Sequence, residues 1–174
     1  MVLYTKAAEG NSGCEYDANV ELLRSISIFR ELPLDVIRSY AYLCERVRYM
    51  EGEYIFRQDE RDSNAYIVVS GVLEAVREVE GQVHSCKRYS AGEFLGSLAL
   101  LAETRRLFSV RAAEPTVCLV LPRKKLLVDI QSAPEVAMRF MQALCQAVVE
   151  WEENILRNTP CCKEDSPEVG VSLI

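Results

Sequence analysis

The chain has 174 residues, of which 49% are hydrophobic and 26% are charged, and its formal net charge is −6 at pH 7. This length suits one domain with a sizeable core and is short for two. The acidic balance argues against non-specific nucleic-acid binding, which depends on basic surfaces, and no apolar run is long enough to span a bilayer.

The first part of the chain predicts an extension followed by two helices. Residues 1–16 are polar, lack an apolar signal segment and are expected to be a flexible extension to a domain over 17–158. Together with seven scattered cysteines, this favours a cytoplasmic protein. Asp17 or Asn19 would cap the first helix, and Pro33 suits the first turn of the second. The first helix is expected to carry Val20, Leu23, Ile26 and Phe29 on one face, and the second Val36, Ile37, Tyr40, Ala41 and Leu43.

The middle of the chain has the pattern of short strands separated by turn residues. A loop framed by Gly92 and Gly96 precedes a short apolar helix at residues 98–102. Strands this short and this closely spaced argue for a β-barrel or a jelly-roll sandwich. The strands are expected at residues 46–50, 54–57, 65–70, 72–79, 83–89, 108–113 and 117–121.

The last third of the chain is expected to be helical, with a short helix at 124–130 and a longer one that opens at Pro134. The longer helix carries apolar residues at spacings of three and four, which either pack on the domain itself or form an interface. We expect a homodimer or a partner protein there, and a flexible tail at 159–174. The stripe consists of Ala137, Phe140, Leu144, Val148, Trp151 and Ile155.

Five segments stand in a recognisable order. They are Phe29-Arg30-Glu31-Leu32-Pro33, Gly52-Glu53-Tyr54-Ile55-Phe56, Tyr66-Ile67-Val68-Val69-Ser70-Gly71, Gly92-Glu93-Phe94-Leu95-Gly96-Ser97-Leu98-Ala99-Leu100, and Arg106 with Ser109-Val110-Arg111-Ala112. The series resembles the cyclic-nucleotide-binding domain family, which includes the catabolite activator protein and the regulatory subunits of cyclic-AMP-dependent kinase. The resemblance runs from about Leu22 to Ile155. It implies an α+β, mainly β fold, a cyclic-nucleotide-binding-like β-barrel (double-stranded β-helix, jelly roll) with N-terminal helices and a long C-terminal helix.

The resemblance implies a binding site for a cyclic phosphate around Gly96. In the family, a glycine lets the backbone approach the ligand, a short helix directs N–H groups at the phosphate, and an arginine makes a forked contact. Arg106 stands at the arginine position, and Arg105 beside it is a substitute. The expected ligand is cyclic AMP or cyclic GMP, with no other cofactor and no metal. The expected ligand-binding residues are Gly96, Ser97, Leu98, Ala99, Arg105, Arg106 and Leu107.

The sequence departs from the family pattern at three places. Ser97 stands at the position of a glutamate that accepts a hydrogen bond from the ribose, and it is also a candidate cap of the short helix. Leu107 and Phe108 replace small residues and would fill the space of the nucleotide. Asp59 and Asp62 replace the glycines of the loop after the second strand, where aspartate tolerates left-handed geometry.

The sequence predicts a regulatory module that senses a cyclic nucleotide or a similar phosphate ligand and signals through its C-terminal helix, and no enzyme. His84 is the only histidine, and the motifs of hydrolases, P-loop proteins and zinc proteases are absent. The alternative is a ligand-free family member that acts as a protein-interaction or dimerisation scaffold, and haem on His84 or another anion is a further option. Too few residues follow Ile155 for a DNA-binding helix-turn-helix, so no DNA contact is expected. Arg106→Ala is expected to abolish phosphate binding and to leave melting nearly unchanged.

Overall fold

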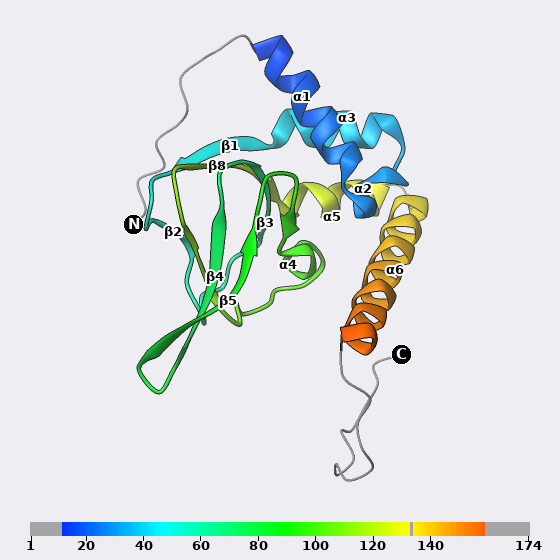
Figure 1. Cartoon of the computed structure of the whole chain (residues 1–174). Coiled ribbons are helices and arrows are strands. Elements are labelled where there is room, and N and C mark those ends of the chain that lie inside the picture. Colours follow the sequence, from blue (N-terminus) through cyan, green and yellow to red (C-terminus); the bar gives the residue numbers. More distant parts are fainter. Residues whose placement is uncertain (1–11, 133, 159–174) are drawn as a thin grey trace.

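The computed structural model describes residues 12–132 and 134–158, and within them eight strands form two antiparallel sheets that share a core (Figure 1). The strand order is β1-β8-β3-β6 in the first sheet and β2-β7-β4-β5 in the second. The expected jelly roll is therefore present, but the two sheets stay separate and do not close into a barrel. The strands are β1 (Glu45–Tyr49), β2 (Tyr54–Phe56), β3 (Asn64–Ser70), β4 (Leu73–Val79), β5 (Gln82–Tyr89), β6 (Phe94–Leu95), β7 (Ser109–Ala112) and β8 (Thr116–Pro122).

Strand β6 is the one strand of the described residues that the sequence pattern did not predict. The other strands begin and end within one residue of their expected limits. β6 has only two residues and pairs with the middle of β3, where Tyr66 lies opposite Leu95 and Ile67 opposite Phe94. This pairing places the next residue, Gly96, beside the start of β3.

Strand β3 is buried on both faces, which explains its continuous apolar run. Successive side chains of a strand point to opposite sides. Ala65 and Ile67 belong to the cluster formed with the helices, whereas Tyr66 and Val68 belong to the cluster between the two sheets. β3 is therefore the wall that separates the two parts of the core.

The helices pack on the outer side of the first sheet (Figure 1). α1 begins before Asp17 and Asn19, so neither residue caps it, and buried Asn19 instead accepts a hydrogen bond from Arg46 Nε at 2.8 Å. Residues 12–16 are thus helical, and the rest of the expected extension and the expected tail lie outside the described residues. The helices are α1 (Ser12–Ser25), α2 (Ser27–Arg30), α3 (Leu34–Leu43), α4 (Ser97–Leu101), α5 (Arg123–Ser132) and α6 (Pro134–Asn158).

Helix α6 contacts the domain through its first half, against α2 and α5. Phe140 is fully buried, with its ring 5.9 Å from the ring of Phe29, whereas Val148 is exposed. The predicted stripe therefore packs on its own domain at one end only, and the side chains of Trp151 and Ile155 lie outside the described residues. In the part of the chain that the structure describes, none of the helices is both long and apolar enough to cross a membrane.

Candidate functional site

Gly96 joins strand β6 to helix α4 through a left-handed backbone. Its φ is +85°, and a Cβ at this position would lie 2.9 Å from Arg106 Nη1 and 3.2 Å from the carbonyl oxygen of Asn64. Gly96 occupies the N-cap position of α4, so Ser97 is the first residue of the helix and the prediction that Ser97 caps it is wrong. Ala99, within α4, is buried. The backbone therefore approaches Arg106 as closely as a glycine permits.

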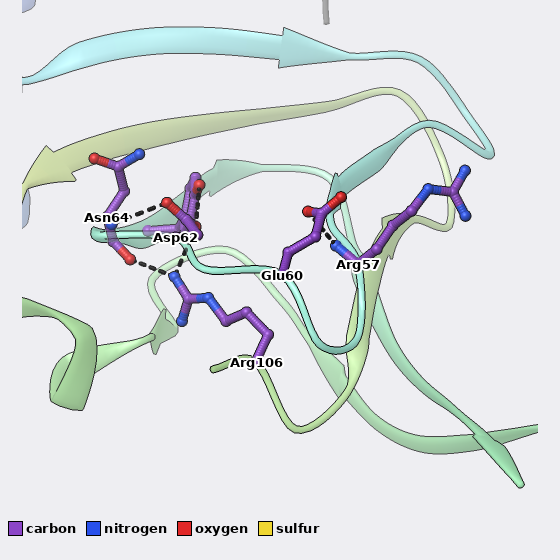
Figure 2. Close-up of polar contacts among 6 residues, drawn as sticks. Arg57, Glu60, Asp62, Asn64 and Arg106 are labelled. Atoms are coloured by element: carbon purple, nitrogen blue, oxygen red, sulfur yellow. Dashed lines mark hydrogen bonds and ion pairs between the residues drawn. The ribbon is translucent and has the colours of Figure 1, made fainter. Parts of the chain in front are cut away.

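Arg106 lies between α4 and β7, and its side chain is directed at Asp62 and Asn64 (Figure 2). The residue is only 7% exposed, and its Cζ lies 4.0 Å from the centroid of the Phe56 ring. Nη2 donates one hydrogen bond to Asp62 Oδ2 at 2.7 Å and another to the carbonyl oxygen of Asn64 at 2.5 Å. The guanidinium is thus stacked on an aromatic ring and held at one nitrogen.

The loop between β2 and β3 is bonded to the backbone of Arg106. The Asp59 N–H donates to the carbonyl of Arg106 at 2.8 Å, and the Arg106 N–H donates to the carbonyl of Glu60 at 2.9 Å. Asp59 has a φ of +69°, which confirms the prediction of left-handed geometry there, whereas Asp62 does not adopt it. The side chain of Glu60 accepts the N–H of Arg57 at 2.8 Å and closes the turn (Figure 2). Arg106 and the loop therefore form one unit.

Asp62 is the centre of the polar contacts in this unit. Its Oδ1 accepts the N–H of Asn64 at 3.0 Å, and its Oδ2 accepts the hydroxyl of Tyr66 at 2.8 Å as well as Arg106 Nη2. Burial raises the pKa of Tyr66 far above its ordinary value, and the neighbouring charge of Asp62 raises it further. Tyr66 therefore stays protonated and donates, and the carboxylate of Asp62 is the anion that faces Arg106.

Three of the other predicted residues, Leu98, Arg105 and Leu107, are exposed to solvent. Arg105 is exposed, and its Nε lies 3.2 Å from Asp59 Oδ1. Leu107 is 70% exposed and Leu98 is 63% exposed, so both side chains face solvent. Phe108 is half-buried against the core between the sheets. The structure thus brings Gly96 and Arg106 together and leaves Arg105 and Leu107 in solvent.

The burial of Arg106 changes the expected effect of Arg106→Ala on melting. Removing one partner of a buried ion pair leaves the other charge unpaired, at a cost of about 3–5 kcal/mol. The side chains of Arg106 and Asp62 are only 8% and 15% exposed, so this cost applies to them. Arg106→Ala is therefore a destabilising substitution, and unchanged melting is no longer expected.

An aromatic cluster connects the site to helix α6. Phe94 of β6 lies two residues before Gly96, and its ring makes an edge-to-face contact with Phe29 of α2 at 5.6 Å. Phe29 in turn contacts Phe140 of α6, with ring centroids 5.9 Å apart. A displacement of the loop at Gly96 thus has a packed route to α6.

The partners of Arg106 could not be predicted from the sequence pattern. Asp62 and Asn64 lie 44 and 42 residues away in sequence, so no local spacing announces the contacts. The one feature of the sequence that could have indicated the contact is the replacement of a loop glycine by Asp62. His84, considered for haem, lies on the exposed strand β5. Among the described residues, no three His, Cys, Asp or Glu side chains gather as metal ligands.

Comparisons with known proteins point to one family. Residues 46–131 match the model of the family described as the cyclic nucleotide-binding domain. The chain is 32% identical to human cGMP-dependent protein kinase 2 over 105 residues, which are 59% of this chain and 14% of the kinase. The chain therefore spans about one seventh of the length of that curated relative.

Two solved structures show the same fold. The catabolite activator protein of Thermus thermophilus is 28% identical, with a TM-score of 0.60 over 76% of this chain and 62% of that one. The regulatory domain of Toxoplasma gondii PKA, solved with cAMP, is 23% identical, with a TM-score of 0.65 over 80% of this chain and 51% of that one. The two sheets and their flanking helices are thus arranged as in those proteins.

Proposed function

We propose, on the premise that residues 46–131 belong to the cyclic nucleotide-binding domain family, that this chain is a regulatory module that binds cyclic AMP or cyclic GMP. The observation that carries the proposal is the buried guanidinium of Arg106 facing the bare backbone of Gly96. A buried cation offers a charge-assisted hydrogen bond to a phosphate oxygen, and a glycine leaves room for the ligand to approach. The phosphate would lie beside both residues, because the Gly96 backbone and Arg106 Nη1 are already close together.

Ser97 makes the proposed site weaker than one that carries a carboxylate for the ribose. A hydrogen bond to a charged group contributes about 1.5–3 kcal/mol, which is roughly a tenfold to hundredfold difference in affinity. Ser97 still offers a hydroxyl, since it is half-buried at the first position of α4. The titrations must therefore extend to millimolar nucleotide.

The test compares two neighbouring arginines with the same substitution. Arg106→Lys keeps a positive charge beside Asp62 but loses the planar fork that binds phosphate through two parallel hydrogen bonds. Calorimetric titration with cyclic AMP and cyclic GMP should show a loss of affinity of at least about tenfold in this variant. Arg105→Lys, a change on an exposed side chain, should bind like the wild type. Wild-type protein that gives no heat with either nucleotide at millimolar concentration would refute the proposal.

The proposed output is a shift of α6 against the domain. The contacts of Phe94, Phe29 and Phe140 support this route, because a change at the Gly96 loop reaches α6 through packed rings. A cleft of about 480 Å³ between α2 and α6, which includes Arg30 and Arg139, leaves space beside α6 for such a shift. The ligand must favour one position of α6 over another for this shift to carry a signal.

A second copy of the chain is the proposed partner of the outer face of α6. This face exposes apolar side chains at spacings of three and four residues, the pattern of a seam between two helices. Isolated exposed apolar residues are normal, whereas a row of them along one helix marks an interaction surface. The row consists of Met138, Met141, Cys145, Val148 and Val149.

A specific observation favours a second candidate function, a scaffold without a ligand. Nη2 of Arg106 already donates to Asp62 and to the Asn64 carbonyl, so the cation has an internal counter-ion. In a scaffold this pair would serve only to join the loop to the domain. The two candidates differ in calorimetry, since the scaffold gives no heat with a cyclic nucleotide and still sediments as a dimer.

A further inference from the structure

The bonds of Arg106 leave neither of its two-donor faces free. A guanidinium offers paired N–H groups on one side from Nε and Nη2 and at its end from Nη1 and Nη2. Nη2 belongs to both faces, and its two hydrogens are directed at Asp62 Oδ2 and at the carbonyl of Asn64. A phosphate that takes two parallel hydrogen bonds from Arg106 must therefore displace one of these acceptors.

The carboxylate of Asp62 is the acceptor that can give way. The Asn64 carbonyl belongs to β3, and Asn64 is in register with Pro122 of β8, so the sheet fixes its position. The Asp62 carboxylate, in contrast, is carried by a side chain in a loop. Its bonds from the Tyr66 hydroxyl and the Asn64 N–H keep it close by even when its bond to Arg106 breaks. A bound phosphate would therefore lose a donor to Asp62 or lie beside its negative charge.

The guanidinium has one buried donor without a partner. Nε of Arg106 is inaccessible to solvent and makes no hydrogen bond to any of the residues that the structure describes. A buried donor of this kind is uncommon and requires an explanation. Moving Asp62 away from Nη2 would free the face that Nε and Nη2 form, and an oxyanion there would satisfy both donors.

We propose that Asp62 is a built-in competitor of the ligand phosphate: it occupies Arg106 in the ligand-free protein and thereby sets the affinity of the site. This inference rests on the proposed binding of a cyclic nucleotide. It makes Asp62 stabilising for the fold and unfavourable for binding at the same time. A purely structural role would instead lower stability and affinity together when Asp62 is changed.

The experiment measures both quantities in Asp62→Asn and in a matched control. Asp62→Asn keeps the shape and removes the charge, and Asp59→Asn removes the same charge from the same loop at an exposed pair with Arg105. Calorimetry with cyclic AMP and cyclic GMP should show affinity at least about tenfold higher in Asp62→Asn than in the wild type and unchanged in Asp59→Asn. Melting should fall in Asp62→Asn and stay near the wild-type value in Asp59→Asn.

The outcomes separate two claims, that the chain binds a cyclic nucleotide and that Asp62 competes with its phosphate. Measurable wild-type binding with unchanged or weaker binding in Asp62→Asn overturns the competition and leaves nucleotide binding in place, because the carboxylate would then position Arg106. No heat in the wild type, in Asp62→Asn or in Asp62→Ser overturns the proposed function and this inference together. Asp62→Ser covers the case in which Asp62→Asn does not fold. This variant is refolded in the presence of nucleotide, freed of it and then titrated.

Discussion

Replacing Gly96 by alanine separates the strain of a left-handed backbone from the close approach that the site requires. Gly92 provides the matched control, because Gly92 and Gly96 both have a φ of +85°. A Cβ at Gly92 meets no atom within 4 Å, whereas a Cβ at Gly96 lies 2.9 Å from Arg106 Nη1 and 3.3 Å from Ala65 Cα. The two alanine variants thus share the backbone strain and differ in the steric contacts.

The expected magnitudes follow from these contacts. A left-handed conformation costs a residue with a Cβ about 1–2 kcal/mol, which applies to both variants. Overpacking adds about 1–3 kcal/mol to Gly96→Ala, because Ala65 Cα and the Asn64 carbonyl belong to the β3 backbone and cannot easily move. The end of Arg106 can shift, but a shift strains its bonds to Asp62 and Asn64. Gly96→Ala should therefore be less stable than Gly92→Ala by about 1–3 kcal/mol.

Urea denaturation followed by circular dichroism measures this difference, provided that the slope m is the same in both variants. A calorimetric titration in parallel should show that Gly96→Ala also loses nucleotide binding, while Gly92→Ala retains it. Equal losses of stability in the two variants would show that the contacts at Gly96 relax without cost. The close approach of Gly96 to Arg106 would then carry no energetic weight, and the reasoning would fail.

Three further predictions concern the core, the route to α6 and the outer face of α6. Burial raises the pKa of Cys44 and Cys118 to about 12 from an ordinary 9.0. Their contribution to the free energy of unfolding is therefore complete below pH 9 and is lost as the pH rises from 9 to 12. Urea midpoints that stay constant over that pH range would contradict this. A thiol reagent at pH 8 should label exposed Cys86 in the native protein and leave Cys44 and Cys118 unlabelled. Phe29→Leu should change nucleotide affinity by less than about threefold but weaken the ligand response of the single tryptophan's fluorescence on α6, and an undiminished response would exclude this route. Met141→Glu should convert a dimer to a monomer in sedimentation, whereas a wild-type chain that sediments as a monomer would remove the proposed interface.

Much of the fold could be predicted because hydrophobic periodicity depends on local residues alone. The unbroken apolar run of β3 identifies a strand buried on both faces, and Pro134 marks the start of α6. The start of α1 was misplaced because Asn19, a residue typical of helix caps, is used within the helix as a buried acceptor for Arg46. Strand β6 escaped prediction because two residues are too few to display a period.

The site could be predicted only in part, because side-chain direction in loops depends on distant contacts. The positions of Gly96 and Arg106 followed from the order of motifs along the chain. The outward direction of Leu107 did not, since it is set by Arg106, whose backbone is bonded to the β2–β3 loop and whose side chain reaches Asp62. The replacement of a glycine by Asp62 suggested only a constraint on the backbone conformation, whereas in the structure the carboxylate of Asp62 is the partner of Arg106.

The distinction between a sensor and a scaffold is therefore a matter of competing anions at one guanidinium. If the free energy gained by phosphate at Arg106 exceeds the free energy of its bond to Asp62, the ligand displaces the Asp62 carboxylate from Arg106 and pulls on the loop that carries it. Because that loop is bonded to the backbone of Arg106 on both sides, it cannot move alone. The movement must then reach Gly96, β6 and the ring of Phe94, which contacts Phe29 beside α6. If the bond to Asp62 is the stronger one, the same contacts make this region a rigid part of the domain, and only the exposed face of α6 remains for a partner.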